Sequence, residues 1–436
     1  MVTRKNKIEL LSPAGDLPRL KTAVAFGADA VYCGLPQWSL RNIREIQFNE
    51  ETIREGVTFA HERGVKVYVT CNIFPHESHI KLLKKDLAKL NKIGFDGIIL
   101  SDIGMLSLAK EFAPDIPIHL STQANTTNSE AIKMWQVLGV KRVILARELS
   151  LLEIKKIHEA VPDIELEIFV HGAMCMAYSG RCLLSKHYTG RDANLGDCAN
   201  SCRWKYQVKN KAPEKVFVQE ESRPDDALEI SEDEHGTYFM NAKDLSALDI
   251  LDQVLDSGVV SVKIEGRAKS IYYVGMITRL YRQALDSLYA GKKVDEKLFA
   301  ELDMVANRGY NHGFLLGRDG YEQEYDVAAI KPNLDFLGQV SEVQDSKFKN
   351  YDIKNSLKIT KLKIKNYVLV EVKNKFAVGD EVEIVTPDQI VKTKITEIFD
   401  NGSLVSEIKK PGEMVEVSFA IGEGVPPYSL IRRKKN

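Results

Sequence analysis

Four of the chain's six cysteines lie within residues 168–206, as Cys175, Cys182, Cys198 and Cys202. Both iron–sulfur clusters and structural zinc accept four thiolates as a ligand set. Structural zinc sites are usually built from two tight pairs of ligands, and only Cys198 and Cys202 come near that pattern. The wide first gap and the long middle loop favour a 4Fe–4S cluster. On spacing alone, a zinc site and cysteines that hold no metal stay open as alternatives.

Imidazole and guanidinium groups lie beside these cysteines in the sequence. His171 ends a predicted strand shortly before Cys175, and Arg181 adjoins Cys182. Positive groups stabilise thiolates and can bind an anionic substrate, although the arginines can equally pair with a nearby acidic run. We take His171 as the candidate catalytic residue and Arg181 as a candidate substrate-binding residue.

A second group of charged residues lies near the end of the predicted barrel domain, where Lys263, Glu265 and Arg267 alternate along a predicted strand. Side chains two positions apart on a strand project to the same side. Charges are costly in a dry core, so this spacing predicts a polar pocket. The alternative is an internal network of salt bridges.

Polar residues also follow two other predicted strands. Gln123 and Asn125 come after residues 118–122, and Arg147 ends residues 142–147. Strand ends at this face of a barrel are where barrel enzymes place their substrate-binding side chains. The candidate substrate-binding residues are therefore Gln123, Asn125, Arg147, Arg181, Lys263, Glu265 and Arg267.

The elements that position these residues follow a repeated pattern, in which a short apolar run precedes a loop and an amphipathic stretch. Near-continuous apolar strands are typical of a parallel sheet covered on both faces. Eight such units, with no dinucleotide-binding glycine fingerprint after the first, favour a TIM-like (β/α)8 barrel. The predicted strands are 8–12, 30–34, 66–72, 97–102, 118–122, 142–147, 166–172 and 261–266.

Two domains are expected. The α/β barrel domain spans residues 1–334 and carries the cysteine-bearing insertion at about 173–240. From residue 335 to 436, short alternating strands separated by turn signals predict a small C-terminal antiparallel β-barrel.

The composition argues against several classes of protein. A net charge of -1 over 436 residues does not suggest a protein that coats nucleic acid through bulk charge. No apolar run is long enough for a signal peptide or a membrane span, so we expect a cytoplasmic protein with no membrane partner. Thiols stay reduced in that compartment. The protease motifs H-E-x-x-H and G-x-S-x-G are missing from the sequence.

Four segments carry a resemblance to a known family: ELLSPAGD, FVHGAMCMAYSGRCLLS, SVKIEGR and NRGYNHGF. They resemble the collagenase-like "unclassified peptidase" family of bacteria, over nearly the whole chain. Some members carry a protease label. Others are similar to the tRNA hydroxylation branch, which converts wobble uridine to 5-hydroxyuridine with prephenate as a precursor. The resemblance implies that Cys175, Cys182, Cys198 and Cys202 hold a 4Fe–4S cluster, which the cell's iron–sulfur assembly machinery would supply.

Three functions follow as expectations. The first is a tRNA-modifying enzyme for the prephenate-dependent hydroxylation of wobble uridine, with the cluster handling electrons and tRNA as partner. The second is a collagenase-like peptidase, for which His171 and Cys175 would serve as base and nucleophile. The third is a non-catalytic iron–sulfur scaffold that recruits another enzyme.

Overall fold

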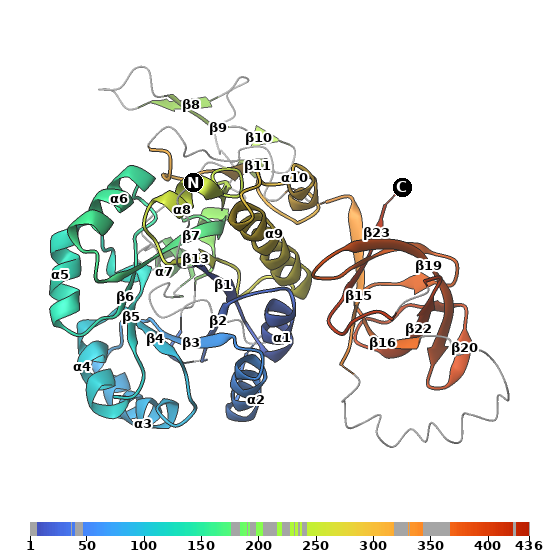
Figure 1. Cartoon of the computed structure of the whole chain (residues 1–436), viewed down its shortest axis with the longest axis horizontal. Helices are drawn as coiled ribbons and strands as arrows, with labels where there is room; N and C mark the ends of the chain where they lie inside the picture. Colours follow the sequence, from blue (N-terminus) through green and yellow to red (C-terminus); the bar gives the residue numbers. More distant parts are fainter. Residues whose placement is uncertain are drawn as a thin grey trace. The chain divides into compact units, whose positions relative to one another are not determined.

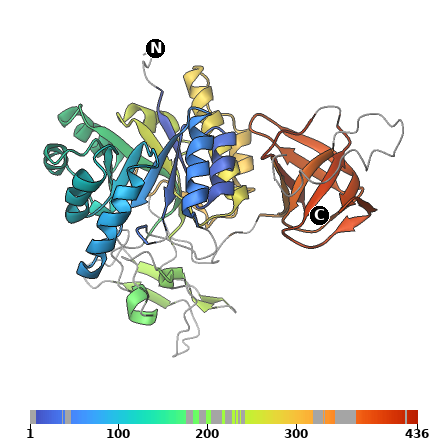
Figure 2. The same ribbon diagram turned by 90° about the horizontal axis from the view of Figure 1, so that it is seen from below.

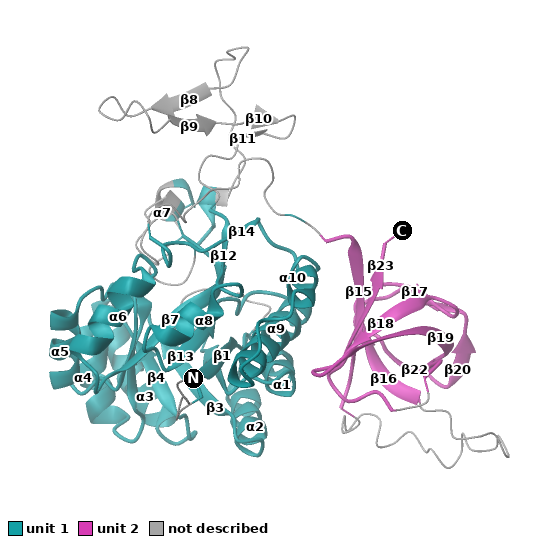
Figure 3. Ribbon diagram, turned by 45° about the horizontal axis from the view of Figure 1, so that its top comes forward, with its two compact units in different colours: residues 1–331 teal, residues 332–436 magenta. Residues whose placement is uncertain are grey.

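The computed structural model divides the chain into two compact units, residues 1–331 and 332–436, which Figure 3 draws in different colours. It describes residues 7–35, 37–39, 47–175, 184–189, 191, 198–203, 216–219, 227–230, 232–233, 236–237, 242–317, 330, 332–342, 367–421 and 424–435. None of the described helices combines the length and the apolar character that crossing a bilayer requires.

A closed parallel barrel forms the centre of the first unit, as the repeated sequence pattern predicted. Its last strand pairs in parallel with both the first and the seventh, which closes the ring. The eight strands of this ring are β1 (Glu9–Pro13), β2 (Ala30–Gly34), β3 (Lys66–Cys71), β4 (Gly97–Leu100), β5 (Ile118–Leu120), β6 (Arg142–Ile144), β7 (Glu165–Ala173) and β13 (Ser261–Ile264).

Helices surround the ring of strands (Figure 1). They are α1 (Leu17–Ala25), α2 (Glu50–His61), α3 (Ile80–Leu90), α4 (Ile103–Phe112), α5 (Ser129–Val137), α6 (Leu151–Ala160), α8 (Leu251–Asp256), α9 (Ile271–Tyr289) and α10 (Lys297–Leu302). Short polar residues begin several of them because their side chains accept a hydrogen bond from an otherwise unsatisfied backbone N–H. Ser150 and Glu153 form such a capping box at α6. Helix α1 packs against both α2 and α9, although α9 is far from α1 in the sequence (Figure 2).

Between β7 and β13 the chain leaves the ring and returns to it. The described parts of this excursion include α7 (Leu184–Thr189), η4 (Ser201–Arg203), β8 (Val216–Gln219), β9 (Ala227–Ile230), β10 (Glu232–Asp233) and β11 (Gly236–Thr237). The chain rejoins the sheet as β12 (Asp244–Ser246), which pairs antiparallel with the end of β7. β14 (Tyr310–Asn311) then pairs in parallel with β12.

The second unit is an antiparallel barrel, again as predicted. Six strands close through the pairing of β18 with β19. They are β15 (Leu334–Val340), β16 (Tyr367–Val372), β18 (Glu381–Val385), β19 (Ile390–Asp400), β22 (Met414–Phe419) and β23 (Leu430–Lys434). The shorter strands are β17 (Phe376–Ala377), β20 (Ser403–Val405) and β21 (Glu407–Ile408). An apolar core fills this barrel, with Leu337, Val370 and Val417 fully buried.

Candidate functional site

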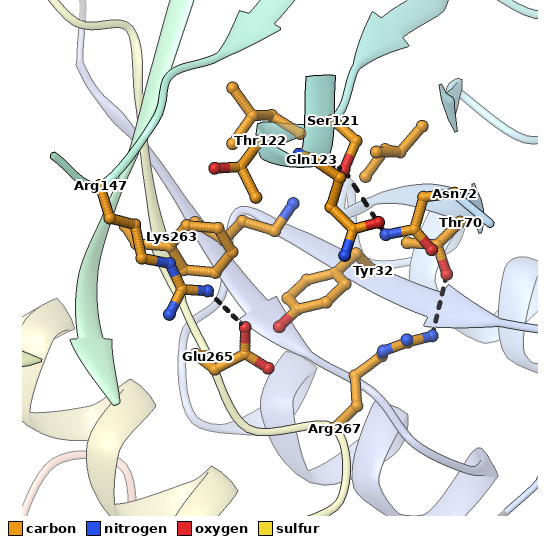
Figure 4. A pocket seen from close by; sticks show the side chains of 13 residues that line it. Tyr32, Thr70, Asn72, Ser121, Thr122, Gln123, Arg147, Lys263, Glu265 and Arg267 are labelled. Atoms are coloured by element: carbon orange, nitrogen blue, oxygen red, sulfur yellow. Dashed lines mark hydrogen bonds and ion pairs between the residues drawn. The ribbon is translucent and has the colours of Figure 1, made fainter. Parts of the chain in front are cut away.

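A polar pocket lies at the carboxyl ends of the strands of the first barrel, the end at which barrel enzymes bind their substrates. Its free volume is about 50 Å³, room for roughly three to five water molecules. Figure 4 shows the side chains that line it. They are Tyr32, Thr70, Asn72, Ile99, Ser121, Thr122, Gln123, Ile144, Arg147, Phe169, Lys263, Glu265 and Arg267.

Arg147 and Glu265 form an ion pair across this pocket. Nη2 of Arg147 lies 2.8 Å from Oε2 of Glu265, and both side chains are about nine-tenths buried. The other terminal nitrogen of Arg147 donates to the carbonyl oxygen of Ala173 at 2.6 Å. The guanidinium also lies 3.9 Å from the centre of the Phe169 ring, a cation–π contact. Arg147 is therefore held from three sides.

Lys263 lies deeper in the barrel. Its Nζ donates to Oε1 of Glu167 at 3.0 Å and lies 4.3 Å from the centre of the Tyr32 ring. Burial lowers the pKa of Lys263, and the charge of Glu167 offsets this effect only in part. The ammonium thus gives up its proton more easily than an exposed lysine.

Arg267 approaches from the loop after β13 and donates to two hydroxyl groups. Its Nη1 donates to Oγ of Ser39 at 2.5 Å and to Oγ1 of Thr70 at 2.8 Å. A Cβ atom at Gly34 would lie 1.8 Å from that nitrogen, so only glycine leaves room for the guanidinium.

A buried charge network underlies the pocket. Arg142 lies 2.5 Å from a carboxylate oxygen of Glu9 and 3.2 Å from one of Glu167, which also binds Lys263. Burial alone would raise the pKa of Glu167, but Lys263 and Arg142 outweigh it and hold the pKa below its usual value. Both interpretations thus hold in part: Lys263, Glu265 and Arg267 all line a pocket, and Lys263 also joins an internal salt-bridge network with Glu167 and Arg142.

Most of the predicted substrate-binding residues come together here. The structure gathers Gln123, Arg147, Lys263, Glu265 and Arg267 around one pocket. Asn125, which ends the short helix η2 (Thr122–Ala124) in a left-handed conformation, is not among the lining residues. Arg181 lies outside the described residues.

His171 is not among the pocket-lining residues; it lies in a cluster of tyrosine rings. It is 1% exposed, and its ring centre lies 5.5 Å from those of Tyr281 and Tyr310 and 6.0 Å from that of Tyr273. Burial lowers the pKa of His171 to about 3, so the imidazole is neutral near pH 7. Its Nδ1 lies 3.4 Å from the Tyr281 hydroxyl.

Three of the four predicted metal ligands lie within the described residues. Cys175, just past β7, and Cys198 and Cys202 near η4 are half-buried, whereas Cys182 lies outside the described residues. The backbone N–H of Asn200 donates to Sγ of Cys198 at 3.4 Å. Hydrogen bonds to sulfur are a feature of iron–sulfur ligands, so this donor chemistry suits such a centre. Among the described residues, no three His, Cys, Asp or Glu side chains form a metal-binding group.

Sequence reasoning missed much of the pocket wall. Tyr32, Thr70 and Phe169 lie on strands and were part of the apolar runs that predicted the strands. The signal that could have found them is the alternation that identified Lys263 and Glu265, applied to every strand. The same alternation marks Arg142 and Glu167 as inward-facing charges.

Comparison with known proteins places these features in a family. Residues 15–325 match the model described as peptidase family U32, and residues 357–432 match its C-terminal domain. The "tRNA hydroxylation protein P" of Haemophilus influenzae is 42% identical, covering 92% of this chain and 90% of its own length.

Two further relatives carry other names. A 23S rRNA 5-hydroxycytidine synthase of Escherichia coli is 37% identical, over 66% of this chain and 41% of its own length. A "Collagenase" of Porphyromonas gingivalis is 33% identical, over 72% of this chain and 74% of its own length. The names of the relatives therefore include both nucleic-acid hydroxylation and proteolysis.

Proposed function

The chain belongs to peptidase family U32, and from this premise we propose that it hydroxylates wobble uridine of tRNA to 5-hydroxyuridine with prephenate as co-substrate. The relatives named for tRNA hydroxylation and rRNA 5-hydroxycytidine synthesis support action on a pyrimidine of RNA. A base that undergoes chemistry must leave its stack, so the enzyme needs a pocket rather than a flat surface.

The observation that carries the proposal is the charge of the pocket. Three cationic side chains, Arg147, Lys263 and Arg267, line it against one carboxylate, Glu265. Prephenate carries two carboxylates, and guanidinium groups bind carboxylates with two parallel hydrogen bonds. A protease pocket for a peptide backbone has no comparable need for clustered cations.

Cys175, Cys182, Cys198 and Cys202 are the proposed ligands of a 4Fe–4S cluster. When bound, such a cluster would supply electron transfer, and the conversion of uridine to 5-hydroxyuridine is a net two-electron oxidation. The chain's own contribution near Cys198 is the backbone N–H of Asn200, which donates to its Sγ at 3.4 Å. Anaerobic purification with iron, sulfide and zinc analysis tests this assignment; zinc without sulfide would contradict it.

The proposed reaction is tested by nucleoside mass spectrometry of tRNA from a strain that lacks the gene. We expect 5-hydroxyuridine and its derivatives to disappear, and to return when the wild-type gene is restored. An Arg267→Gln variant should fail to restore them, whereas Arg54→Gln, which alters an exposed ion pair on α2, should restore them fully. Unchanged hydroxyuridine in the deletion strain would rule the proposal out.

Peptidase activity is a second candidate, favoured by the relative named collagenase. Cys175 would then act as nucleophile, and purified protein should cleave a gelatin substrate in a manner that Cys175→Ser abolishes. Cleavage that survives this change would point to a contaminant. An intact cluster with neither activity in purified protein would favour a scaffold that acts through another enzyme.

A further inference from the structure

We propose that Lys263 is a nucleophile, whose amine forms a protonated imine with a small aldehyde or ketone that enters the pocket. The amine would need neither RNA nor prephenate for this step, so the inference goes beyond the proposed function. The bond that forms is covalent and is reversed by water.

Burial sets Lys263 apart from the other lysines. Its side chain is 4% exposed, and it is the single buried lysine among the residues that the structure describes. Burial disfavours the charged form of an amine, and proteins obtain reactive lysines in this way. The lowered pKa of Lys263 agrees with this position, because loss of solvent is its largest cause.

The surroundings of Nζ leave one side of the amine to a ligand. Oε1 of Glu167, at 3.0 Å, is its hydrogen-bond acceptor, and no other acceptor contacts it within the described part of the chain. The ring centres of Tyr32 and Phe169 lie 4.3 and 5.4 Å away. Aromatic faces attract an ammonium but donate no hydrogen bond to a neutral amine. The deprotonated nitrogen therefore keeps its lone pair for a carbonyl carbon.

A small carbonyl compound can reach this nitrogen through the pocket. Lys263 is among the lining residues, and Figure 4 shows it between Arg147 and Tyr32. The free volume is about 50 Å³. Acetaldehyde takes the space of about three water molecules, so it fits the pocket as it stands.

The step balances without an outside reactant. Two of the three ammonium protons leave with the carbonyl oxygen as water, one of them by way of Glu167, and a C–N double bond replaces the C–O double bond. Nothing is oxidised or reduced. The protonated imine keeps the positive charge beside Glu167, which matters because an unpaired charge in this buried network is costly.

Reductive trapping on the full-length wild-type protein tests the inference. Acetaldehyde with cyanoborohydride converts an imine into ethyl-lysine, and peptide mass spectrometry locates the ethyl group. Lowering the pKa of an amine by one unit leaves about ten times as much of the neutral form. At pH 7 we therefore expect Lys263 to be labelled about tenfold faster than Lys133, an exposed lysine paired with Glu130. Equal or slower labelling of Lys263 would overturn the inference.

Two conservative variants separate Lys263 from the surface lysines. Lys263→Arg keeps a positive charge but forms no imine, so the fast phase of labelling in the intact protein should disappear, whereas Lys133→Arg should keep it. A fast phase that survives Lys263→Arg would refute the assignment. Should that variant fail to fold, the peptide map of the wild type still decides. Fast labelling of Lys263 together with unchanged hydroxyuridine in the deletion strain would sink the proposed reaction and leave this inference standing.

Discussion

The two barrels of this chain fill their interiors in opposite ways. The parallel barrel encloses Glu9, Arg142, Glu167 and Lys263 in one charge network. The antiparallel barrel encloses aliphatic and aromatic side chains, and its Arg432–Glu383 pair, 2.7 Å apart, is buried beside them. Buried ion pairs add little net stability, whereas apolar burial adds about 25 cal/mol per Å². The comparison teaches that the barrel proposed to bind a substrate encloses charged side chains, whereas the other barrel is filled by apolar packing.

Among the predicted changes, removing Glu167 should cause the largest loss of unfolding free energy. Glu167→Ala leaves Arg142 and Lys263 buried without their shared carboxylate, so we expect a loss of about 3–5 kcal/mol of unfolding free energy. All three tryptophans lie in residues 1–331, so tryptophan fluorescence in urea reports on this unit. The control is Glu165→Ala, which removes a half-exposed partner of Arg142. Equal losses for both variants would show that burial of the charge does not matter.

Truncating Leu337 probes the apolar barrel. Leu337 is fully buried, and Leu337→Ala should cost about 2–5 kcal/mol through lost transfer free energy and a residual cavity. Hydrogen exchange should show faster amide exchange in residues 332–436 while prephenate affinity stays constant. The exposed Leu404→Ala on β20 should leave exchange in this barrel nearly unchanged. A change in affinity with Leu337→Ala would mean that the two interiors do not have separate roles.

Acid should weaken the first unit through His171. Its pKa of about 3 in the folded protein lies below the usual 6.5, so the unfolded state binds the proton more readily. Stability is therefore lost as pH falls below 6.5, by about 1.4 kcal/mol for each pH unit until the folded pKa is reached. Urea titrations at pH 6.5 and 5.5 measure this slope. His171→Phe should reduce it; an identical slope in that variant would assign the acid sensitivity to other groups.

Removing one hydroxyl group beside Arg267 should have the smallest effect, a modest loss of prephenate affinity. Ser39→Ala deletes a hydroxyl that Arg267 contacts, and we expect prephenate to bind about 2–10-fold more weakly, about 0.5–1.5 kcal/mol. Thr22→Ala, which removes a buried hydroxyl bond to the backbone of α1, should leave affinity unchanged. No loss with Ser39→Ala would mean that Arg267 does not need this contact to face the ligand.

Much of the fold followed from the sequence because its strands are short apolar runs at regular spacing. The alternation of Lys263, Glu265 and Arg267 predicted a polar pocket, and the structure places all three there. Tyr32 and Phe169 could not be told from core residues, because an aromatic ring in an apolar strand fits both roles. The cysteine ligand set stays a prediction.

The position of the His171 side chain depends on a register shift between β7 and β13, which the hydrophobic pattern of the sequence does not reveal. Strand β7 pairs Phe169 with Lys263, and then His171 with the next residue, Ile264. This register shift puts an extra residue into β7, and a shift of one residue moves the following side chain to the other face. His171 therefore meets the tyrosines of α9 instead of the pocket.

The cysteine-bearing excursion leaves the sheet at the end of β7 and rejoins it at β12, where Ala173 pairs with Asp244. The pairing of these two strands therefore holds the two ends of the excursion side by side. Doubling the length of a loop with fixed ends costs only about 0.6 kcal/mol. We therefore expect that insertions or deletions in this segment change the stability of the barrel only slightly.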